Sequence, residues 1–523
     1  MGTDLQVSAG KIVSVNPATG EVLCELEFAD ENEVRAAVAR AHAAQNAWAT
    51  LGVRARIAVL SRFQHELAEK KSHIATAITQ EAGKPVAEAL TTEVLVVLDA
   101  TRFLIDNAHC LLRDEPLAHG SLVTKLKSGL LVREPYGVVG IISPWNYPFS
   151  IPATETLAAL VAGNAVVLKP SELTSLVARE LQSLLHGAGV PRDIFQVVVG
   201  DGATGEALVH SRIDKLVFTG SLATGKRIAA AAAERLLPMV LELGGKDPML
   251  VLEDADIDVA SSAAMWGAFV NAGQTCLSVE RCYVHRSRYQ EFLRACVEKT
   301  NTLRVGPGLD RETDIGPMIH ERQLRIVESQ VEDAVGRGAR VLTGGRRLLN
   351  LGKNFYTPTV LADVAHEMLI MRQETFGPIL PVMPFDSDDE AVQLANDSEY
   401  GLAASVWTSS RDRGQRLARR IQAGTVMVND VVSCFGISEA PHGGMKCSGL
   451  GRTHGRFGLE EMVRLKYLDL DRMPRMKKIW WYNYGATFAR PMEAFIDFQF
   501  ARGVKNRLSG ALRLASIVGR KPL

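Results

Sequence analysis

The chain has 523 residues, of which 47% are hydrophobic and 23% are charged, and its 59 basic side chains balance 59 acidic ones. A chain of this length and composition buries a large core and divides into two or three domains, so we expect a soluble globular protein. Because the formal net charge is zero, no global field attracts the chain to nucleic acid, and we expect no nucleic-acid partner.

The first ten residues contain no basic segment followed by an apolar run, and no apolar stretch reaches the roughly 20 residues of a spanning helix. We therefore expect a cytoplasmic protein without a membrane-spanning segment. Its seven cysteines are scattered, and no two form a Cys-x-x-Cys pair. This distribution argues against a disulfide framework or a zinc ribbon, so we expect reduced thiols and no bound metal.

The first part of the chain is helical in its sequence pattern. Between residues 30 and 82, apolar residues recur at helical spacing and predict amphipathic helices. Residues 121–134 alternate partly between apolar and polar side chains and predict an exposed hairpin. Such a hairpin often pairs with another subunit.

From residue 138 the pattern changes to strand-like runs that alternate with helical stretches. The predicted strands span residues 138–142, 165–168, 195–199 and 215–218, and the predicted helices span 154–162, 173–186 and 220–233. This alternation is typical of a parallel sheet with crossover helices, which makes the chain an α/β protein. A further strand at 249–252 opens a second α/β region, so we place a domain boundary near Leu243.

Basic and aromatic side chains accumulate after residue 470. The basic residues include Lys477, Lys478, Arg490, Arg502, Lys505, Arg507, Arg513, Arg520 and Lys521, and the aromatic ones are Trp480, Trp481, Tyr482, Tyr484, Phe488, Phe495, Phe498 and Phe500. This composition suits a helix that lies in a membrane interface. The alternative, which we favour slightly, is a helical tail that packs on the protein's own oligomer.

Cys276 stands at a polar break between apolar stretches, directly after a turn that contains Gly273. A structural cysteine would be more typical inside the preceding helical run, so this position favours a reachable nucleophile. Thiolate attack on a carbonyl creates an oxyanion, which needs hydrogen-bond donors fixed in advance. Asn146 offers such a donor, because Pro144 and Pro148 restrict its loop at the end of a predicted strand. The alternative is a rigid turn in which the Asn146 side chain bonds its own backbone.

Glu242 lies between apolar neighbours and precedes Gly244 and Gly245 at the predicted domain boundary. Partial desolvation would raise its pKa toward neutrality, as a general base requires. The alternative for Glu242 is a structural role in a salt bridge.

The usual Gly-x-Gly-x-x-Gly fingerprint of dinucleotide binding is absent. Residues 218–225 instead form a strand end that runs through Ser221 into a helix, whose N-terminus can hold a pyrophosphate. The segment Lys169-Pro170-Ser171-Glu172 also ends a predicted strand, and a carboxylate there can bind both hydroxyls of an adenosine ribose. Because a 2′-phosphate would be repelled by Glu172, this residue favours NAD over NADP.

Six segments resemble motifs of the aldehyde dehydrogenase superfamily and appear in the family's order. They are residues 144–148, 169–172, 218–221, 242–246, 273–276 and 374–378. The resemblance implies an α/β aldehyde dehydrogenase-like fold with a Rossmann-like cofactor domain, an α/β catalytic domain and a small β oligomerisation arm. It assigns residues 1–120 and 136–243 to the NAD-binding domain, 244–460 to the catalytic domain, 121–135 and 461–475 to the arm, and 476–523 to a C-terminal extension.

The resemblance also implies oxidation of an aldehyde to a carboxylic acid by a homodimer or homotetramer. Cys276 would be the nucleophile, Asn146 and the Cys276 amide the oxyanion hole, and Glu242 the base that hydrolyses the thioester. The implied cofactor-binding residues are Trp145, Lys169, Ser171, Glu172, Gly220, Ser221, Gly225, Leu243, Glu374 and Phe376. Relatives that pass the acyl group to coenzyme A generally lack this base, so Glu242 favours hydrolysis.

Three regions, residues 144–148, 278–281 and 451–455, resemble a bacterial group often named succinate-semialdehyde dehydrogenase. Well-studied members place an arginine six residues before the nucleophile to pair with the distal carboxylate, whereas this chain has Val270 there. An apolar wall of Phe269, Val270 and Trp266 would favour a neutral aldehyde, since burial of an unpaired carboxylate costs several kcal/mol. We therefore expect a neutral aliphatic or aromatic aldehyde, with succinate semialdehyde as the alternative.

His442 and His454 depart from the family's usual residues, and we expect them to pack in loops. Two other classes of function stay open. One is a scaffold that has lost catalysis and uses its C-terminal extension, and the other is a thioesterase that uses Cys276 and Glu242 without a cofactor. The joint presence of Cys276, Glu242 and Asn146 counts against the scaffold.

Overall fold

The computed structural model describes residues 7–8, 11–125, 127–478, 480–482, 484 and 488–518. The chain separates into two compact units, one formed by Met1–Arg113 and Arg133–Lys466 and the other by Asp114–Val132 and Tyr467–Leu523. Within the described residues, no helix combines the length and the apolar character that crossing a membrane requires. Most of the first ten residues, and Arg520 and Lys521 of the basic extension, lie outside the described residues.

The first sheet of the larger unit has six strands in the order β18-β10-β9-β6-β7-β8. They are β6 (Val138–Ile142), β7 (Ala165–Lys169), β8 (Phe195–Val197), β9 (Lys215–Thr219), β10 (Met239–Glu242) and β18 (Gly449–Leu450). All neighbours are parallel except β18, which runs antiparallel to β10. Because β6 lies between β7 and β9, the strand order reverses there, and the carboxyl ends of β6 and β9 flank the crevice where such sheets bind ligands.

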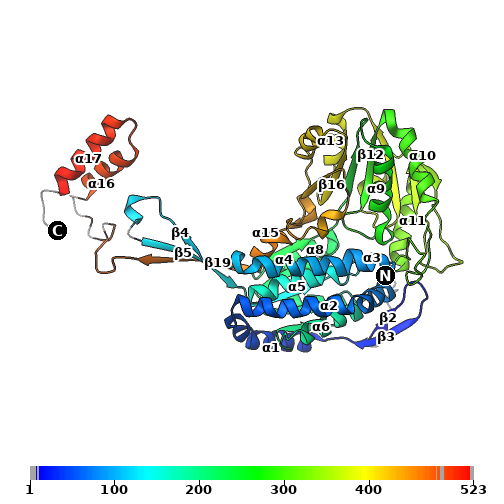
Figure 1. The fold of residues 1–523 in the computed structure, drawn as a ribbon, viewed down its shortest axis with the longest axis horizontal. Helices are drawn as coiled ribbons and strands as arrows, with labels where there is room; N and C mark the ends of the chain where they lie inside the picture. Colours follow the sequence, from blue (N-terminus) through cyan, green and yellow to red (C-terminus); the bar gives the residue numbers. More distant parts are fainter. Residues whose placement is uncertain are drawn as a thin grey trace. The chain divides into compact units, whose positions relative to one another are not determined.

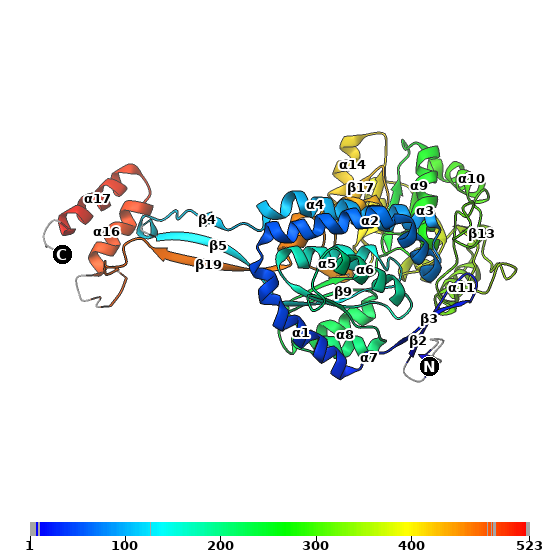
Figure 2. The same ribbon diagram turned by 60° about the horizontal axis from the view of Figure 1, so that its bottom comes forward.

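Helices pack around this sheet (Figures 1 and 2). They are α1 (Glu31–Thr50), α2 (Val53–Ala82), α4 (Leu95–Leu111), α5 (Ser150–Ala162), α6 (Ser175–Gly187), α7 (Gly202–His210) and α8 (Leu222–Ala233). Strands β6 and β7 are buried at every residue, as expected when both faces of a parallel sheet are covered. Helix α1 begins where a capping box starts, because Asp30 accepts from the Glu33 N–H and Glu33 accepts from the Asp30 N–H, both at 2.8 Å.

The second sheet has seven strands in the order β13-β14-β15-β12-β11-β16-β17. They are β11 (Asp247–Val251), β12 (Val279–His285), β13 (Arg340–Thr343), β14 (Thr359–Ala362), β15 (Ile379–Phe385), β16 (Ala403–Trp407) and β17 (Thr425–Val428). Its helices include α9 (Ile257–Phe269), α10 (Tyr289–Thr300), α11 (Glu321–Gly336), α13 (Asp388–Asn396) and α14 (Arg411–Ala418). This sheet has a hydrophobic core of its own, and the chain passes from the first core to the second between Leu243 and Met249.

Two mainly parallel sheets with crossover helices confirm the predicted α/β fold class. The assignment of the two cores to an NAD-binding and a catalytic domain stays a prediction. A small antiparallel sheet of β1 (Val7–Ser8), β2 (Lys11–Val15) and β3 (Val22–Glu27) completes the described strands near the N-terminus.

The smaller unit contains a three-stranded sheet in the order β19-β5-β4 and two helices. Its strands are β4 (Glu115–Leu117) and the parts of β5 (Lys127–Pro135) and β19 (Val463–Asp471) that belong to this unit, and its helices are α16 (Ala489–Phe500) and α17 (Val504–Val518). The prediction of a hairpin within residues 121–134 is wrong in detail. Residues Leu122–Thr124 form a short 3₁₀ helix, and the strand that pairs with β5 is β4.

Candidate active site

A cavity of about 380 Å³ lies at the carboxyl ends of β6 and β9. The predicted site residues that line it are Trp145, Asn146, Gly220, Ser221, Glu242, Leu243, Cys276, Glu374 and Phe376. Trp145 and Asn146 follow β6, Gly220 and Ser221 follow β9, and Glu242 and Leu243 lie at the end of β10. The other three residues are Cys276, Glu374 and Phe376. Residues far apart in the sequence therefore meet in this cavity. We call this hollow the polar cavity, because carboxylates, amides and imidazoles line much of it.

A second cavity of about 220 Å³ shares Cys276, Ile151 and Phe435 with the polar cavity. Its other lining residues are Thr91, Thr92, Val96, Tyr147, Trp266, Thr275, Leu277, Val432, Ser433 and Gly436. No charged side chain is among these lining residues, so we call this hollow the apolar cavity. Cys276 therefore stands where the two cavities meet.

The sequence predicted that Phe269, Val270 and Trp266 form an apolar wall beside Cys276. Of these three residues only Trp266 lines the apolar cavity, so the prediction is wrong for Phe269 and Val270. Phe269 is 1% exposed and Val270 is 3% exposed, and both pack into the second hydrophobic core. Helix α9 turns its Phe269 side toward that core, whereas Trp266 is 45% exposed and lines the apolar cavity. The wall is completed by residues from other segments, among them Val96 and Leu277.

The remaining predicted cofactor residues lie away from the polar cavity. Glu172 lines a third cavity of about 400 Å³, which shares His320 with the polar cavity. Lys169 is buried and donates to the Glu172 carboxylate at 3.4 Å. The buried Ser171 hydroxyl accepts from the Leu173 N–H at 3.3 Å. Gly225 packs on another predicted residue, since a Cβ there would come within 2.4 Å of the Leu243 side chain.

The turn before Cys276 has an unusual backbone. Asn271 and Ala272 have φ values of 55° and 53°, in the left-handed region that few non-glycine residues adopt. Gly273 has a φ of 72°, and a Cβ at this position would lie 2.1 Å from the Gly377 carbonyl oxygen. Only glycine fits here. Such strain persists where surrounding contacts fix it, and here it directs the thiol to the junction of the cavities.

Desolvation raises the pKa of the Cys276 thiol, and the carboxyl groups of Asp247, Glu242 and Glu374 raise it further. The thiol is therefore the resting form in the free protein. Asn146 also lines the polar cavity, and its Nδ2 donates to the Gln274 carbonyl oxygen at 3.1 Å. An amide nitrogen carries two hydrogens, so one donor of Asn146 is left for a ligand.

Glu242 is buried, and neither of its carboxyl oxygens has a hydrogen-bond partner among the described residues. Burial raises its pKa well above the usual range, the nearby Glu155 raises it further, and Arg452 opposes the shift. His442 Nε2 lies 3.8 Å from Glu242 Oε2, but burial lowers the pKa of His442 to about 3 and keeps the ring neutral. An unpaired carboxyl group that faces a cavity is suited to bind and deprotonate water.

Several residues that line the polar cavity were not predicted from the sequence. Glu155 projects from α5, and burial raises its pKa to about 8. The His320 ring packs edge-on against the Trp145 ring, with 5.7 Å between the ring centroids. The Phe376 ring also packs edge-on against Trp145, with 5.4 Å between the centroids. The predicted histidines do lie in loops, yet both line the polar cavity, where His442 and His454 contact Phe435.

The family model for the aldehyde dehydrogenase family matches residues 6–468. The chain belongs to the aldehyde dehydrogenase family. It is 39% identical over 492 residues to a Methylomonas protein named 4,4'-diapolycopene aldehyde oxidase, which covers 93% of this chain and 91% of that protein. It is 40% identical over 452 residues to a Mycolicibacterium smegmatis protein provisionally named succinate-semialdehyde dehydrogenase [NADP(+)], with 86% of each chain covered.

Among solved structures, an NAD-dependent aldehyde dehydrogenase from Sinorhizobium meliloti superposes on this aldehyde dehydrogenase with a TM-score of 0.86. The two are 35% identical, and the match covers 90% of this chain and 93% of the other. The Methylomonas alignment extends into the C-terminal extension, because a match to 93% of a 523-residue chain cannot end before about residue 486. As an aldehyde dehydrogenase, the protein is an oxidoreductase of aldehydes that uses a pyridine nucleotide.

The residues present fit such a cofactor. The N-terminus of α8 opens on the polar cavity, where Ser221 caps it by accepting from the Thr224 N–H at 3.4 Å. Helix N-termini favour anionic groups such as a pyrophosphate. The neighbouring cavity at Glu172 offers room for the adenosine end, and Glu374 and Phe376 lie near the Cys276 end.

Proposed function

We propose that this enzyme oxidises a neutral, apolar aldehyde to a carboxylic acid with NAD, through a thioester on Cys276 that Glu242 hydrolyses. The observation that carries the proposal is the position of Cys276 between an apolar cavity and a polar cavity. The aldehyde would enter from the apolar side, and water and the cofactor would occupy the polar side. The proposal assigns residues 1–120 and 136–243 to NAD binding and residues 244–460 to catalysis.

In the proposed first step, the Cys276 thiol gives its proton to solvent through water in the polar cavity, and Sγ attacks the carbonyl carbon. The carbonyl oxygen becomes an oxyanion, which the free N–H of Asn146 and the Cys276 amide stabilise; loss of one such donor costs about 3 kcal/mol. A bound oxidised nicotinamide would supply the acceptor for the hydride that leaves this carbon, and its positive charge would favour the thiolate. Collapse of the oxyanion leaves a thioester on Cys276.

Glu242 acts in the second step. In its ionised form it takes a proton from water, the hydroxide attacks the thioester carbonyl, and the Cys276 thiolate leaves as the carboxylic acid forms. Because desolvation raises the pKa of Glu242, its carboxylate is a stronger base than an exposed one. Replacement by glutamine should stop this step and leave the acyl group on the enzyme.

NAD is proposed over NADP because Glu172 faces the cavity offered to the adenosine ribose, where a 2′-phosphate would be repelled. The Mycolicibacterium relative is named for NADP and the Sinorhizobium structure for NAD, so relatives of both names are known. Initial rates with each cofactor, measured at saturating aldehyde, test the assignment. A higher kcat/KM with NADP would contradict it.

The substrate proposal rests on the absence of charged side chains among the residues that line the apolar cavity. A carboxylate placed there would lose its hydration without gaining a partner, which costs several kcal/mol. The name of the Methylomonas relative specifies an aldehyde of 4,4'-diapolycopene, a hydrocarbon polyene, and agrees with this reading. Succinate semialdehyde is the alternative, favoured by the name of the Mycolicibacterium relative.

We also propose that the arm at residues 121–135 and 461–475 joins subunits into a homodimer or homotetramer. Strand β19 lies at an edge of its sheet and exposes Tyr467, Leu468 and Leu470. Exposed apolar edge strands are rarely left uncovered in soluble proteins. Light scattering of the full chain measures the oligomer size, and a monomer at micromolar concentration would contradict the proposal.

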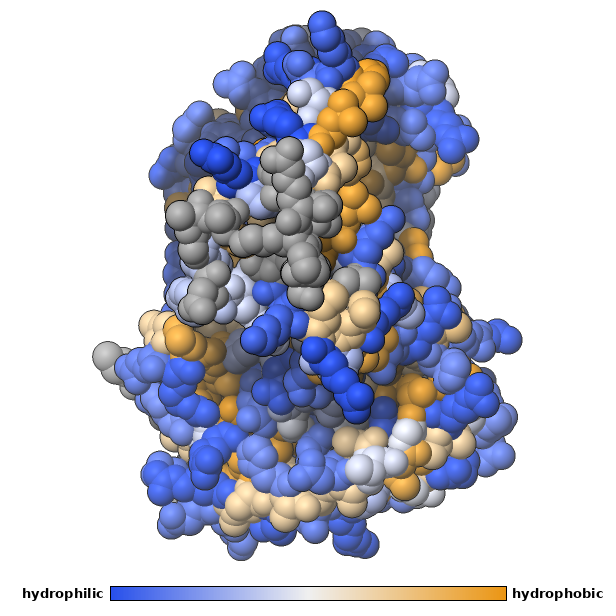
Figure 3. All heavy atoms as spheres, turned by 90° about the vertical axis from the view of Figure 1, so that its left-hand side faces the viewer, coloured by the Kyte–Doolittle hydropathy of each residue, from blue (hydrophilic) through white to orange (hydrophobic). Residues whose placement is uncertain are grey.

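The C-terminal extension presents apolar residues at helical spacing. Val504, Leu508 and Leu512 follow one another along α17 and are 75%, 58% and 72% exposed. Figure 3 shows apolar side chains beside hydrophilic ones on the side of the molecule that it views. We propose that this stripe packs on the oligomer, with a membrane interface as the alternative. Deletion of residues 476–523 should reduce the oligomer size. If the deletion instead abolishes sedimentation with anionic vesicles, the extension is a membrane contact. If neither the oligomer size nor the sedimentation changes, both roles are refuted.

Two other functions predict different results. A catalytically silent scaffold would form no NADH from any aldehyde while keeping its oligomer. A cofactor-independent thioesterase would hydrolyse thioesters with Cys276 and Glu242 but would not bind NAD in calorimetry.

A further inference from the structure

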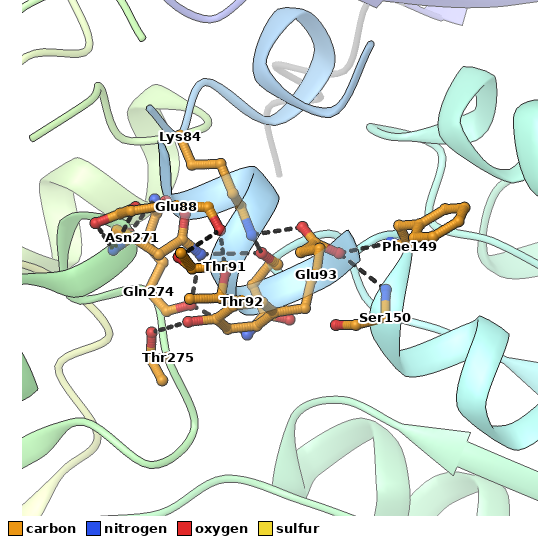
Figure 4. A network of polar contacts seen from close by, with 12 residues as sticks. Lys84, Glu88, Thr91, Thr92, Glu93, Phe149, Ser150, Asn271, Gln274 and Thr275 are labelled. Atoms are coloured by element: carbon orange, nitrogen blue, oxygen red, sulfur yellow. Dashed lines mark hydrogen bonds and ion pairs between the residues drawn. The ribbon is translucent and has the colours of Figure 1, made fainter. Parts of the chain in front are cut away.

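A buried network of ionic and polar groups joins the loop of Asn146 to the turn before Cys276 (Figure 4). Its three charged members are Lys84, Glu88 and Glu93, and none of them is among the residues that line the polar cavity. Lys84 follows the end of α2, Glu88 ends the short helix α3 (Val86–Glu88), and Glu93 belongs to the π-helix Ala89–Val94. The proposed mechanism uses none of these groups.

The Lys84–Glu93 pair holds the Asn146 loop at both of its ends. Lys84 Nζ donates to Glu93 Oε1 at 2.6 Å and to the Asn146 carbonyl oxygen at 2.7 Å, and both charged side chains are fully buried. Glu93 Oε2 accepts from the backbone N–H groups of Phe149 and Ser150 at 2.8 and 2.9 Å. The loop is therefore fixed before and after Tyr147.

Glu88 holds the other side of the site. Its carboxylate accepts from the backbone N–H of Asn271 at 3.0 and 3.1 Å, and Asn271 is the left-handed residue in the turn before the nucleophile. The Asn271 side chain in turn donates to the carbonyl oxygens of Asn146 and Gln274 at 2.9 and 3.1 Å. Asn146 Nδ2 donates to the same Gln274 oxygen, so the two loops are tied through shared acceptors.

The π-helix explains how both glutamates reach these loops. In a π-helix, hydrogen bonds join residues five apart, so residues five apart lie one turn from each other on one face. Glu88 and Glu93 are five apart at the start of this segment. In an α-helix the same two residues would point in different directions.

We infer that Lys84, Glu88 and Glu93 are positioning residues that hold the Asn146 amide in line with Cys276, so that the oxyanion donor is aligned for the chemical step. The inference rests on the proposed roles of Asn146 and Cys276. It assigns to these three residues an effect on kcat rather than on substrate binding, since none of them is among the residues that line either cavity. Misalignment of about 1 Å at a reacting group can cost about 100-fold in rate.

The test compares Glu88→Ala with Glu88→Gln, because glutamine keeps an oxygen that can accept from the Asn271 N–H. Glu88→Ala should lower kcat about 10- to 100-fold with KM within about twofold, and Glu88→Gln should restore most of it. Asp214→Ala is the matched control. Asp214 also accepts from a backbone N–H, that of Val138 at 2.8 Å, but at the amino end of β6, so kcat should not change.

A double-mutant cycle separates alignment of Asn146 from a general loss of structure. If Glu88 acts through Asn146, the Glu88→Ala change should have little further effect on kcat in an Asn146→Ala protein. Multiplicative effects, or a change in KM alone, would overturn the inference. If Asn146→Ala by itself leaves kcat unchanged, the proposed oxyanion role fails, which is a result distinct from failure of the positioning network.

Discussion

The apolar cavity predicts how activity should depend on the aldehyde. Each methylene that enters an apolar site contributes about 0.8 kcal/mol, or about fourfold in kcat/KM. Along a series of straight alkanals, kcat/KM should rise by about this factor per carbon until the cavity of about 220 Å³ is filled. Succinate semialdehyde should fall at least about 100-fold below the alkanal of equal length, because its carboxylate loses hydration worth several kcal/mol.

NADH formation at 340 nm, with kcat/KM taken from the linear range of substrate concentration, measures this series. Trp266→Ala sharpens it, since Trp266 lines the apolar cavity and is only partly exposed. The variant should have a kcat/KM about tenfold lower than that of the unchanged enzyme with a long alkanal, and a nearly unchanged kcat/KM with acetaldehyde, because only the long chain reaches the Trp266 side chain. A flat series in the unchanged enzyme, or a preference for succinate semialdehyde, would refute the assignment of this cavity to a neutral substrate.

Three further changes test single residues. Ionised Glu155 raises the pKa of Glu242, and Glu242 acts as a base only when it is deprotonated, so activity should fall as the pH drops through the pKa of Glu242. The Glu155→Gln change should therefore move the acid limb of the pH–activity profile to lower pH. An acid limb that does not move would show that Glu155 does not influence the base. Glu172→Gln should improve kcat/KM for NADP relative to NAD by about tenfold, since one repelled charge is worth about 1–2 kcal/mol at a partly exposed site. Gly273→Ala should leave a folded protein with little activity, because its Cβ would meet the Gly377 carbonyl oxygen at 2.1 Å, and normal turnover would show that the turn can relax.

Local patterns in the sequence predicted the parts of the site that depend on local structure. Cys276, Glu242 and Asn146 each follow or end a strand or helix, and a polar residue at such a break stands out against its apolar neighbours. The strands from 138 to 218 agree closely with β6 to β9, because β-branched runs bounded by turns signal buried strands. The fold class followed from their alternation with helices.

Other features depend on burial and tertiary contact, which a sequence pattern does not reveal. Glu88 and Glu93 look like ordinary charges on a helix surface, yet the chain buries them against two loops. The strand Glu115–Leu117 was missed because it contains Pro116, which weakens a strand signal and is tolerated here at the edge of the sheet. Helix α9 carries apolar residues on its exposed side, Val259 and Trp266, as well as on its buried side, so its sequence could not show that Phe269 faces the core while Trp266 faces the cavity.

The central claim is that Cys276 carries the acyl group and that Glu242 removes it. The most direct test is intact-protein and peptide mass spectrometry of the Glu242→Gln variant after incubation with hexanal and NAD. The account predicts one equivalent of NADH and one acyl group on the peptide that contains Cys276, with none when Cys276 is also replaced by alanine. An acyl group on another of the seven cysteines, or steady turnover by the Glu242→Gln variant, would contradict it.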